Sequence, residues 1–203
     1  MELYHLKIYI DDLLHRAVRP VLQSSEIFSQ ITSNRVKGYN GTEEVEYGEY
    51  PQYVPAFKTQ TILESEYKRG MNKTGRSYTF DSVKNDAYRT RFKPVTYEEY
   101  EYQGKKYIRI KANLKYDFRR CKLSNGVEYE DNDYVWVEVS PVKWLIDDNT
   151  GILVSKKGLV SGIRFVNDRT NYKGDFNITE MKEYLDKYML RDLTQTVTFT
   201  RIQ

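Results

Sequence analysis

The chain has 203 residues, a length that suits one domain or one domain with an appended lobe. Charged residues make up 30% and the formal net charge is +3, so the surface is well solvated but lacks the strong basicity of a dedicated polyanion binder. No apolar run approaches the roughly 20 residues of a membrane span, and residues 1–19 carry acids and histidines where a signal peptide needs an unbroken apolar stretch. The single cysteine, Cys121, excludes an intrachain disulfide. We therefore expect a cytoplasmic protein that does not enter a membrane, or a fragment of a larger exported protein.

The first 42 residues are predicted to form a helical segment of their own. Apolar residues recur at helical spacing over residues 4–18, and Pro20 limits this helix. A second short helix is predicted over residues 26–32. The apolar residues that define the first helix are Leu6, Ile10, Leu13, Leu14 and Val18.

The next stretch is predicted to contain a strand and a helix. Residues 43–47 alternate as a strand does, and residues 48–55 hold two prolines and are predicted to be a turn-rich connection. Residues 57–69 have helical periodicity and end at Gly70. The residues expected on the inward face of this helix are Phe57, Ile62, Leu63 and Tyr67.

From about residue 78 the apolar period changes from 3.6 to 2, which indicates strands. Residues 96–102 and 107–111 flank Gln103-Gly104 and predict a hairpin. A second pair of strands is predicted over residues 134–139 and 142–146, and Ser140-Pro141 is predicted to separate them. The other predicted elements are strands over 77–80, 152–155 and 160–165, a turn over 147–151 and an edge strand within 194–202.

The last helix is predicted to begin at Asn177, with Glu180 completing a capping box. Its expected apolar face comprises Ile178, Met181, Leu185, Tyr188 and Met189. Helices, then mostly strands, then one helix predict an α+β fold with an antiparallel sheet. We expect a helical segment over 1–42 and an α+β domain over 43–203, with a tyrosine-rich basic insertion at about 71–133.

Four short motifs occur in an order that resembles a known family. The run VEYGEYPQ (45–52) is similar to a V-x-F-G-x-Y-P-Q opening. Trp144-Leu145-Ile146 is similar to a W-x-V-L strand, Leu153-Val154-Ser155-Lys156 to L-L-S-K, and residues 179–188 to a helix S-x-I-R-x-W-L-N-x-x-F. Together they resemble a Firmicutes-type bacterial domain of unknown function, often attached to surface or repeat proteins and distantly similar to C-type-lectin-like and formylglycine-generating-enzyme-like folds.

The resemblance covers about half of the chain, and its motifs are spread from about residue 45 to residue 193. It implies a compact, loop-rich α+β domain used for display and binding. In the family the Y-P-Q turn leads quickly to the Trp strand, whereas about 90 residues intervene here. We expect any activity private to this protein to lie in those added residues.

Residue patterns typical of catalysis or metal binding are weak. Cys121 lies among arginines and a lysine, which would lower its thiol pKa if it were exposed, but no nucleophile signature surrounds it. Acidic clusters at 128–133 and 147–149 could supply calcium ligands, and solvated turns explain them equally well. We expect no cofactor and no metal.

Basic and aromatic residues alternate along residues 88–122. Cationic side chains neutralise phosphates and aromatic rings stack on bases. On the predicted strand, Tyr107, Arg109 and Lys111 share one face and could form a ribbon of charge and rings. The alternative is an ordinary strand face balanced by acidic neighbours such as Glu98, Glu99 and Glu101 across the hairpin. The candidate binding residues are Tyr88, Arg89, Arg91, Lys105, Tyr107, Arg109, Lys111, Lys115, Tyr116, Arg119 and Arg120.

Tyrosine dominates the aromatic residues, with 19 Tyr against 8 Phe and 2 Trp. Tyrosine suits half-buried strands, and it also suits a surface that contacts a partner. The main hypothesis is therefore a non-catalytic module that recognises a protein through a tyrosine-rich charged surface. If the chain comes from a phage or mobile element, we expect it to inhibit a host system. The alternatives are a nucleic-acid-binding protein that uses residues 88–122 and a ligand-binding domain of a surface protein.

Overall fold

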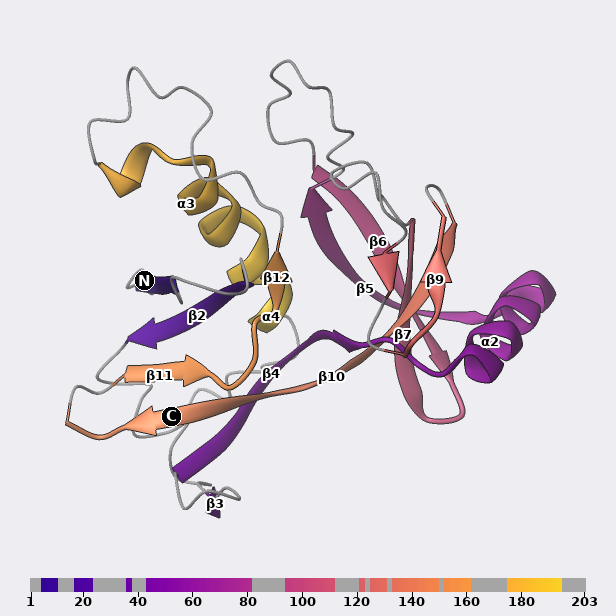
Figure 1. Cartoon of the computed structure of the whole chain (residues 1–203), viewed down its shortest axis with the longest axis horizontal. Coiled ribbons are helices and arrows are strands. Elements are labelled where there is room, and N and C mark those ends of the chain that lie inside the picture. The colour runs from indigo at the N-terminus through magenta and orange to yellow at the C-terminus, as the bar shows by residue number, and fades with distance from the viewer. Residues whose placement is uncertain are drawn as a thin grey trace, which may run out of the picture. The chain divides into compact units, whose positions relative to one another are not determined.

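The computed structural model combines antiparallel strands with a few helices, including one near the C-terminus, so the chain has a mixed α+β fold (Figure 1). The residues that it describes are 5–10, 17–23, 36–37, 43–81, 94–111, 121–122, 125–130, 133–149, 152–161 and 175–194. The chain divides into two compact units. The first unit comprises 1–50, 141–163 and 185–203, and the second comprises 51–140 and 164–184. The predicted boundary at residue 42 and the predicted insertion at 71–133 stay predictions.

The first unit is built around antiparallel strands. Strand β1 (His5–Ile10) pairs with β2 (Ala17–Gln23), which also pairs with β11 (Ile152–Ser155) and β12 (Val160–Ser161). The C-terminal half of β10 (Tyr134–Asp147) pairs with β11. Strand β3 (Val36–Lys37) pairs with β4 (Glu43–Tyr53), and β4 also pairs with β10.

The predicted helix over residues 4–18 is wrong in the part that the structure describes. Residues 5–10 and 17–23 form an antiparallel strand pair in which Ile8 lies opposite Pro20. Leu6, Ile8 and Ile10 alternate at period 2, and Leu6 and Ile10 also fit a helical stripe, so the local pattern is ambiguous. Pairing with a neighbouring strand decides between the two periods. The second predicted helix, 26–32, lies outside the described residues.

Two predicted breaks are also wrong. Strand β4 continues through Gly48 and Pro51 to Tyr53, where a turn-rich segment was expected. Strand β10 continues through Ser140 and Pro141. Its pairing with β7 covers residues 134–139 and its pairing with β11 covers 144–147, so Pro141 lies between these two ladders.

The second unit packs helix α2 (Phe57–Gly70) against a sheet. The sheet order is the N-terminal half of β10, then β7 (Lys105–Lys111), β6 (Pro94–Tyr102) and β5 (Asn72–Asp81). The predicted helix over 57–69 and the hairpin at Gln103-Gly104 are confirmed. Both turn residues have positive φ, which lets the tight turn follow the twist of its strands.

Aromatic rings form the core under helix α2. Leu63 is buried with Tyr100, Tyr107 and Trp136. The Tyr67 ring lies edge-on to those of Tyr100 and Trp136, with centroids 5.4 and 5.7 Å apart. Burial, with Tyr67 nearby, raises the pKa of Tyr100 to about 12. Much of the tyrosine in this unit therefore serves packing.

A buried carboxylate lies between β5 and β6. The Glu99 side chain is fully buried and accepts hydrogen bonds from Thr74 Oγ1 at 2.7 Å and Tyr78 Oη at 2.9 Å. A shift in strand register between Lys73 and Ser77 brings Thr74 to this position. The hydrogen bonds offset part of the cost of burying the charge.

The C-terminal helical segment is confirmed, but its start and its apolar face differ from the prediction. It consists of the short 3-10 turn η1 (Phe176–Ile178), α3 (Glu180–Tyr184), the π-helical turn η2 (Leu185–Met189) and α4 (Leu190–Thr194). Thr179 Oγ1 accepts the Lys182 N–H at 3.0 Å, so Thr179 caps the helix instead of Asn177. The predicted inward residue Ile178 is exposed, whereas Met181 is buried. The predicted strand 194–202 falls almost wholly outside the described residues.

Within the described residues, the structure contains no helix that combines the length and the apolar character needed to cross a membrane.

Candidate functional site

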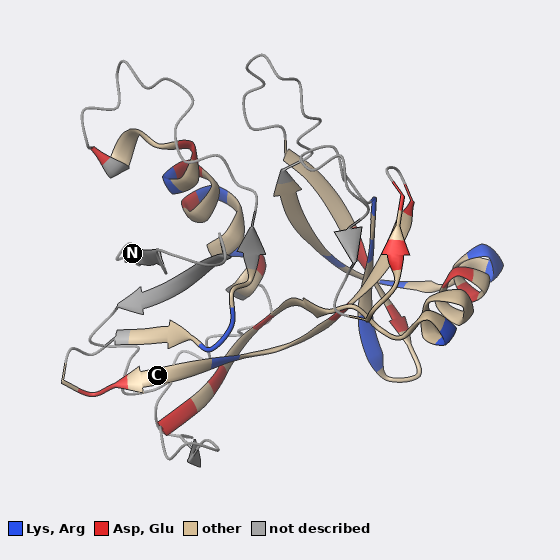
Figure 2. Cartoon of the chain, in the orientation of Figure 1, with Lys and Arg blue, Asp and Glu red and all other residues tan. Residues whose placement is uncertain are grey.

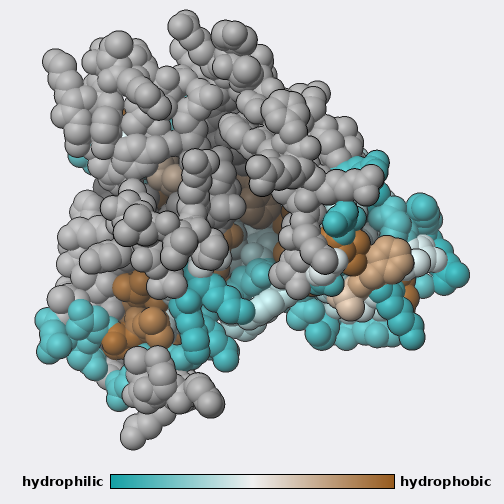
Figure 3. All heavy atoms as spheres, viewed as in Figure 1, coloured by the Kyte–Doolittle hydropathy of each residue, from teal (hydrophilic) through white to brown (hydrophobic). Residues whose placement is uncertain are grey.

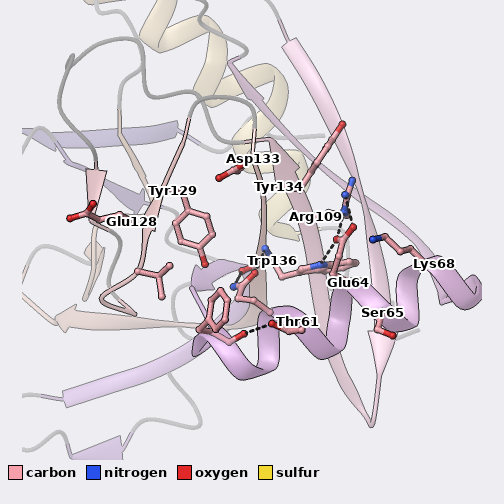
Figure 4. Close-up of a pocket in the computed structure, with 13 residues that line it drawn as sticks. Thr61, Glu64, Ser65, Lys68, Arg109, Glu128, Tyr129, Asp133, Tyr134 and Trp136 are labelled. Atoms are coloured by element: carbon pink, nitrogen blue, oxygen red, sulfur yellow. Dashed lines mark hydrogen bonds and ion pairs between the residues drawn. The ribbon is translucent and has the colours of Figure 1, made fainter.

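A groove of about 580 Å³ runs beside helix α2 in the second unit, and we call it the α2 groove (Figure 4). Helix α2 forms one side of the groove, and strands β7, β9 (Glu128–Tyr129) and β10, with the residues just before β9 and β10, contribute the rest. The lining residues are Phe57, Gln60, Thr61, Glu64, Ser65, Lys68, Arg109, Val127, Glu128, Tyr129, Asp133, Tyr134 and Trp136.

Gln60 fixes the helix against the sheet beneath the groove. Its Nε2 donates to the Trp136 carbonyl at 2.7 Å, and its Oε1 accepts the Trp136 N–H at 2.7 Å. One side-chain amide thus satisfies both backbone groups of a buried residue, as a neighbouring strand would. The Gln60 contact sets the position of the helical face that lines the groove.

A charged pair holds the middle of the groove. Glu64 accepts Arg109 Nε at 2.8 Å and Nη2 at 2.9 Å, and it also accepts the Trp136 indole N–H at 3.2 Å. The Arg109 guanidinium lies 3.5 Å from the Tyr134 ring centroid and 4.8 Å from that of Tyr67. Figure 4 shows Arg109 between Glu64 and Tyr134. Cation–π contacts and a two-point ion pair therefore orient the same guanidinium.

The pKa values of this pair move apart. Hydrogen bonds from Arg109 lower the pKa of Glu64, against the opposing effect of burial. Burial alone would lower the pKa of Arg109, but the hydrogen bonds and charge of Glu64 outweigh it, so the pKa is raised. Both groups are therefore ionised at neutral pH.

The other wall of the groove is held by the turn before β9. Asn125 Nδ2 donates to the Pro55 carbonyl at 2.8 Å and to Tyr129 Oη at 3.1 Å. Since Pro55 lies two residues before the start of helix α2, these bonds tie the two walls together. Asp133 Oδ2 accepts the Glu130 N–H at 2.9 Å and orders the approach to β10.

Two aromatic rings of the groove remain open to solvent. Phe57 is 64% exposed and Tyr134 is 48% exposed, although both are large apolar side chains. Figure 3 shows an apolar patch in the region of helix α2, bordered by hydrophilic residues. Exposed apolar surface rimmed by polar groups is typical of an interaction site. Phe57 and Ile62 were expected to face inward, and both expectations are wrong, because the core contact of the helix comes from Leu63.

Seven of the eleven sequence-predicted binding residues lie outside the described residues, namely Tyr88, Arg89, Arg91, Lys115, Tyr116, Arg119 and Arg120. The other four lie on β7. Lys105 forms an exposed ion pair with Glu138 at 3.1 Å, and this hydrogen bond raises the pKa of Lys105. Lys111 is exposed at the strand end.

Tyr107 and Arg109 face helix α2 and do not form an open ribbon. Tyr107 is buried in the aromatic core, and burial raises the pKa of its hydroxyl. Arg109 is bound to Glu64 from the helix. Of the predicted set, the described structure therefore brings only Arg109 into the groove.

The structure describes only some of the residues considered for catalysis or metal binding. Cys121 lies on the short strand β8 (Cys121–Lys122), opposite Tyr129 of β9. In the predicted acidic turn, Asp147 accepts the Asn149 N–H at 3.1 Å. The described residues contain no group of three or more His, Cys, Asp or Glu side chains arranged to hold a metal ion.

Comparisons with protein-family models, curated proteins and solved structures find no match to the chain. The resemblance to the Firmicutes-type domain therefore stays a prediction. Two of the stretches on which it rests meet in the first unit, where Trp144 Nε1 donates to the Tyr47 carbonyl at 2.8 Å.

Proposed function

We propose that the chain is a non-catalytic binding module that recognises a protein partner through the α2 groove. The observation that carries the proposal is the exposure of the Phe57 and Tyr134 rings on a groove whose walls are fixed by hydrogen bonds. Rigid aromatic side chains supply large contact area with little loss of side-chain entropy.

The charges in the groove favour binding over acid–base catalysis. A group that transfers protons near neutral pH needs a pKa close to that pH. The pKa of Glu64 is lowered and the pKa of Arg109 is raised, both away from neutral pH, since each group stabilises the ionised form of the other. Such a pair is suited to holding shape and charge.

The described part of the basic stretch gives less support to nucleic-acid binding. Lys105 and Arg109 already have carboxylate partners in Glu138 and Glu64. A phosphate backbone would have to compete with those partners for both cations. A salt-dependent gel shift at about 50 mM salt, where phosphate contacts are strong, tests this alternative for the whole chain.

Site-specific photo-crosslinking in the cell of origin tests the proposal. A benzophenone amino acid replaces Phe57 in one variant and Ile62 in the matched control. Ile62 lies on the same helix and is 38% exposed, but it does not line the groove. We expect one protein to be crosslinked at stoichiometric yield from position 57 and not from position 62. Equal yields, or no protein adduct from position 57, would refute the proposal.

A further inference from the structure

We infer that residues 125–130 form a strap that opens and closes the α2 groove, with Asn125 as its latch. The strap includes β9 and supplies Val127, Glu128 and Tyr129 to one wall of the groove. The structure shows the closed form, in which hydrogen bonds hold this wall in place. We expect the partner to bind the closed form, and this consequence for binding rests on the proposed function.

The strap is not paired with the main sheet in the part of the chain that the structure describes. Strand β9 pairs with β8, in a two-stranded sheet separate from the ten-stranded sheet that contains β7 and β10. Among the described strands, no backbone ladder therefore joins this wall to the sheet that carries helix α2. A segment attached in this way opens locally at a lower free energy than the sheet beside it.

Only one side chain of the strap is buried. Tyr129 is 7% exposed and lines the groove. The residues on either side of it, Glu128 and Glu130, are exposed, and Figure 2 shows acidic colour on β9. Side chains alternate between the two faces of a strand, so one face of the strap is charged and exposed and the other carries the buried ring. Tyr129 therefore supplies the main apolar contact of the strap.

Asn125 supplies hydrogen bonds that hold the strap closed. Its Nδ2 donates to the Pro55 carbonyl at 2.8 Å and to Tyr129 Oη at 3.1 Å. Its Oδ1 accepts the Val127 N–H at 3.1 Å. The bond to Pro55 joins the strap to the chain just before helix α2, and the bond to Tyr129 fixes the ring that lines the groove. One side chain thus couples the position of the strap to that of its buried ring.

The Pro55 carbonyl connects the latch to the base of the groove. It also accepts a hydrogen bond from Gln60 Nε2 at 3.4 Å, and the same Nε2 donates to the Trp136 carbonyl at 2.7 Å. The latch, the helix and the sheet therefore meet at one carbonyl oxygen. When the strap opens, this oxygen keeps Gln60 as a donor, so opening leaves helix α2 docked on the sheet.

A second tie, at the far end of the strap, does not reach helix α2. The Glu130 N–H donates to Asp133 Oδ2 at 2.9 Å, and the Glu130 carbonyl accepts the Asp133 N–H at 3.2 Å. These bonds hold the strap to the beginning of β10 and leave its distance from helix α2 to Asn125. The two ties therefore have separate roles, one anchoring the strap and the other closing it.

Loss of the latch should shift the strap towards its open form by a predictable factor. One neutral hydrogen bond changes an equilibrium by about two- to twelvefold. Asn125→Asp removes both bonds of Nδ2 and keeps an oxygen for the Val127 N–H, so we expect the ratio of open to closed strap to rise about tenfold or more. Tyr129→Phe removes the hydroxyl bond alone and keeps the ring, and we expect a smaller rise.

The distance between the strap and helix α2 measures the opening. Nitroxide labels on Glu128→Cys and Arg69→Cys, two exposed positions, give that distance by pulsed electron paramagnetic resonance in the full chain with Cys121→Ser. We expect one short distance with the latch intact and a second, longer distance in Asn125→Asp. The matched control is Asn149→Asp, at an exposed position of the first unit, and it should leave the distances unchanged.

A second pair of labels distinguishes opening of the strap from movement of the helix. Arg69→Cys with Lys111→Cys spans helix α2 and β7, and we expect its distance to be the same with and without the latch. A single, unchanged strap distance in both Asn125→Asp and Tyr129→Phe overturns the inference. A longer distance for both label pairs also overturns it, since the helix would then have moved.

The protein crosslinked from position 57 separates this inference from the proposed function. When it is added to Asn125→Asp at about ten times its dissociation constant, we expect the ratio of open to closed strap to fall about tenfold. Growth of the open population would overturn the inference that the closed form binds. If position 57 crosslinks a partner but the strap does not open, the inference fails while the proposed function stands. If the strap opens but position 57 crosslinks nothing, the proposed function fails while the strap stands.

Discussion

The Glu64–Arg109 pair gives the most quantitative prediction for the groove. Glu64 accepts three hydrogen bonds, two of them from the Arg109 guanidinium and all between 2.8 and 3.2 Å. The side chains of Glu64 and Arg109 are 30% and 16% exposed, so the pair lies between a surface ion pair, worth about 0–1 kcal/mol, and a buried charged hydrogen bond, worth about 1.5–3 kcal/mol. We expect Glu64→Ala to lower the free energy of unfolding by about 2 kcal/mol.

A double-mutant cycle isolates the interaction. We expect Glu64→Ala and Arg109→Met together to cost at least about 1 kcal/mol less than the sum of the two single changes. Urea unfolding followed by tryptophan fluorescence measures each step. Additive losses within about 0.3 kcal/mol would refute the claim that the two side chains act as a unit.

The same pair predicts a pH dependence. Because Arg109 lowers the pKa of Glu64 in the folded state, the stabilisation is present above the ordinary carboxyl pKa of 4.5 and is lost as the pH falls through the lowered folded value. The stability difference between the wild type and Glu64→Ala should therefore be constant from pH 7 to about pH 5 and shrink below it. A difference that grows on acidification would contradict this assignment.

Three further changes test other parts of the structure. Gly48→Ala should lower the free energy of unfolding by about 2–4 kcal/mol, because φ is +69° and the new Cβ would lie 2.6 Å from a carbonyl oxygen. Gly104→Ala, with φ of +72° in open space, should lower it by only about 1 kcal/mol. Equal losses for the two variants in urea unfolding would contradict this reasoning. Thr179→Ala should lower the free energy of unfolding by about 1 kcal/mol through the lost helix cap, and Asn177→Ala by less than about 0.5 kcal/mol. The reverse order in thermal unfolding would show that Asn177 is the cap, as the sequence predicts. Gln60→Leu should cost about 2–4 kcal/mol by leaving both backbone groups of a buried residue unpaired, and an unchanged urea midpoint would exclude that role.

Elements with strong local signals were predictable from sequence. The helix over 57–69 has a clear period, and the Gln103-Gly104 pair marks the hairpin turn. The N-terminal residues lacked such a signal, because the spacing of Leu6 and Ile10 fits both a helix and a strand. Only the antiparallel pairing of β1 with β2 decides that case.

The prolines of the two long strands give a misleading local signal. Because proline cannot donate to a ladder, Pro51 and Pro141 favour breaks in the sequence pattern. Both lie inside continuous strands. In β10, Gln52 Nε2 donates to the carbonyl of the residue before Pro141 at 2.8 Å, a side-chain contact that no local pattern reports.

The groove itself had little sequence signal. Its walls come from residues 57–68, 109 and 127–136, which meet only through packing. The alternation on β7 correctly placed Tyr107 and Arg109 on one face, but the sequence did not show that helix α2 covers that face. The outward position of Phe57 follows from how Gln60 and Leu63 dock the helix.

The affinity of the protein crosslinked from position 57 tests the central claim most directly. Its dissociation constant is measured by titration calorimetry against the wild type, Phe57→Ser and the matched Ile62→Ser variant. A hot-spot residue in the centre of an interface contributes at least about 2 kcal/mol. We therefore expect Phe57→Ser to weaken binding by more than about tenfold and Ile62→Ser by less than about twofold. Equal affinities for all three proteins would show that the partner binds elsewhere and would contradict the account.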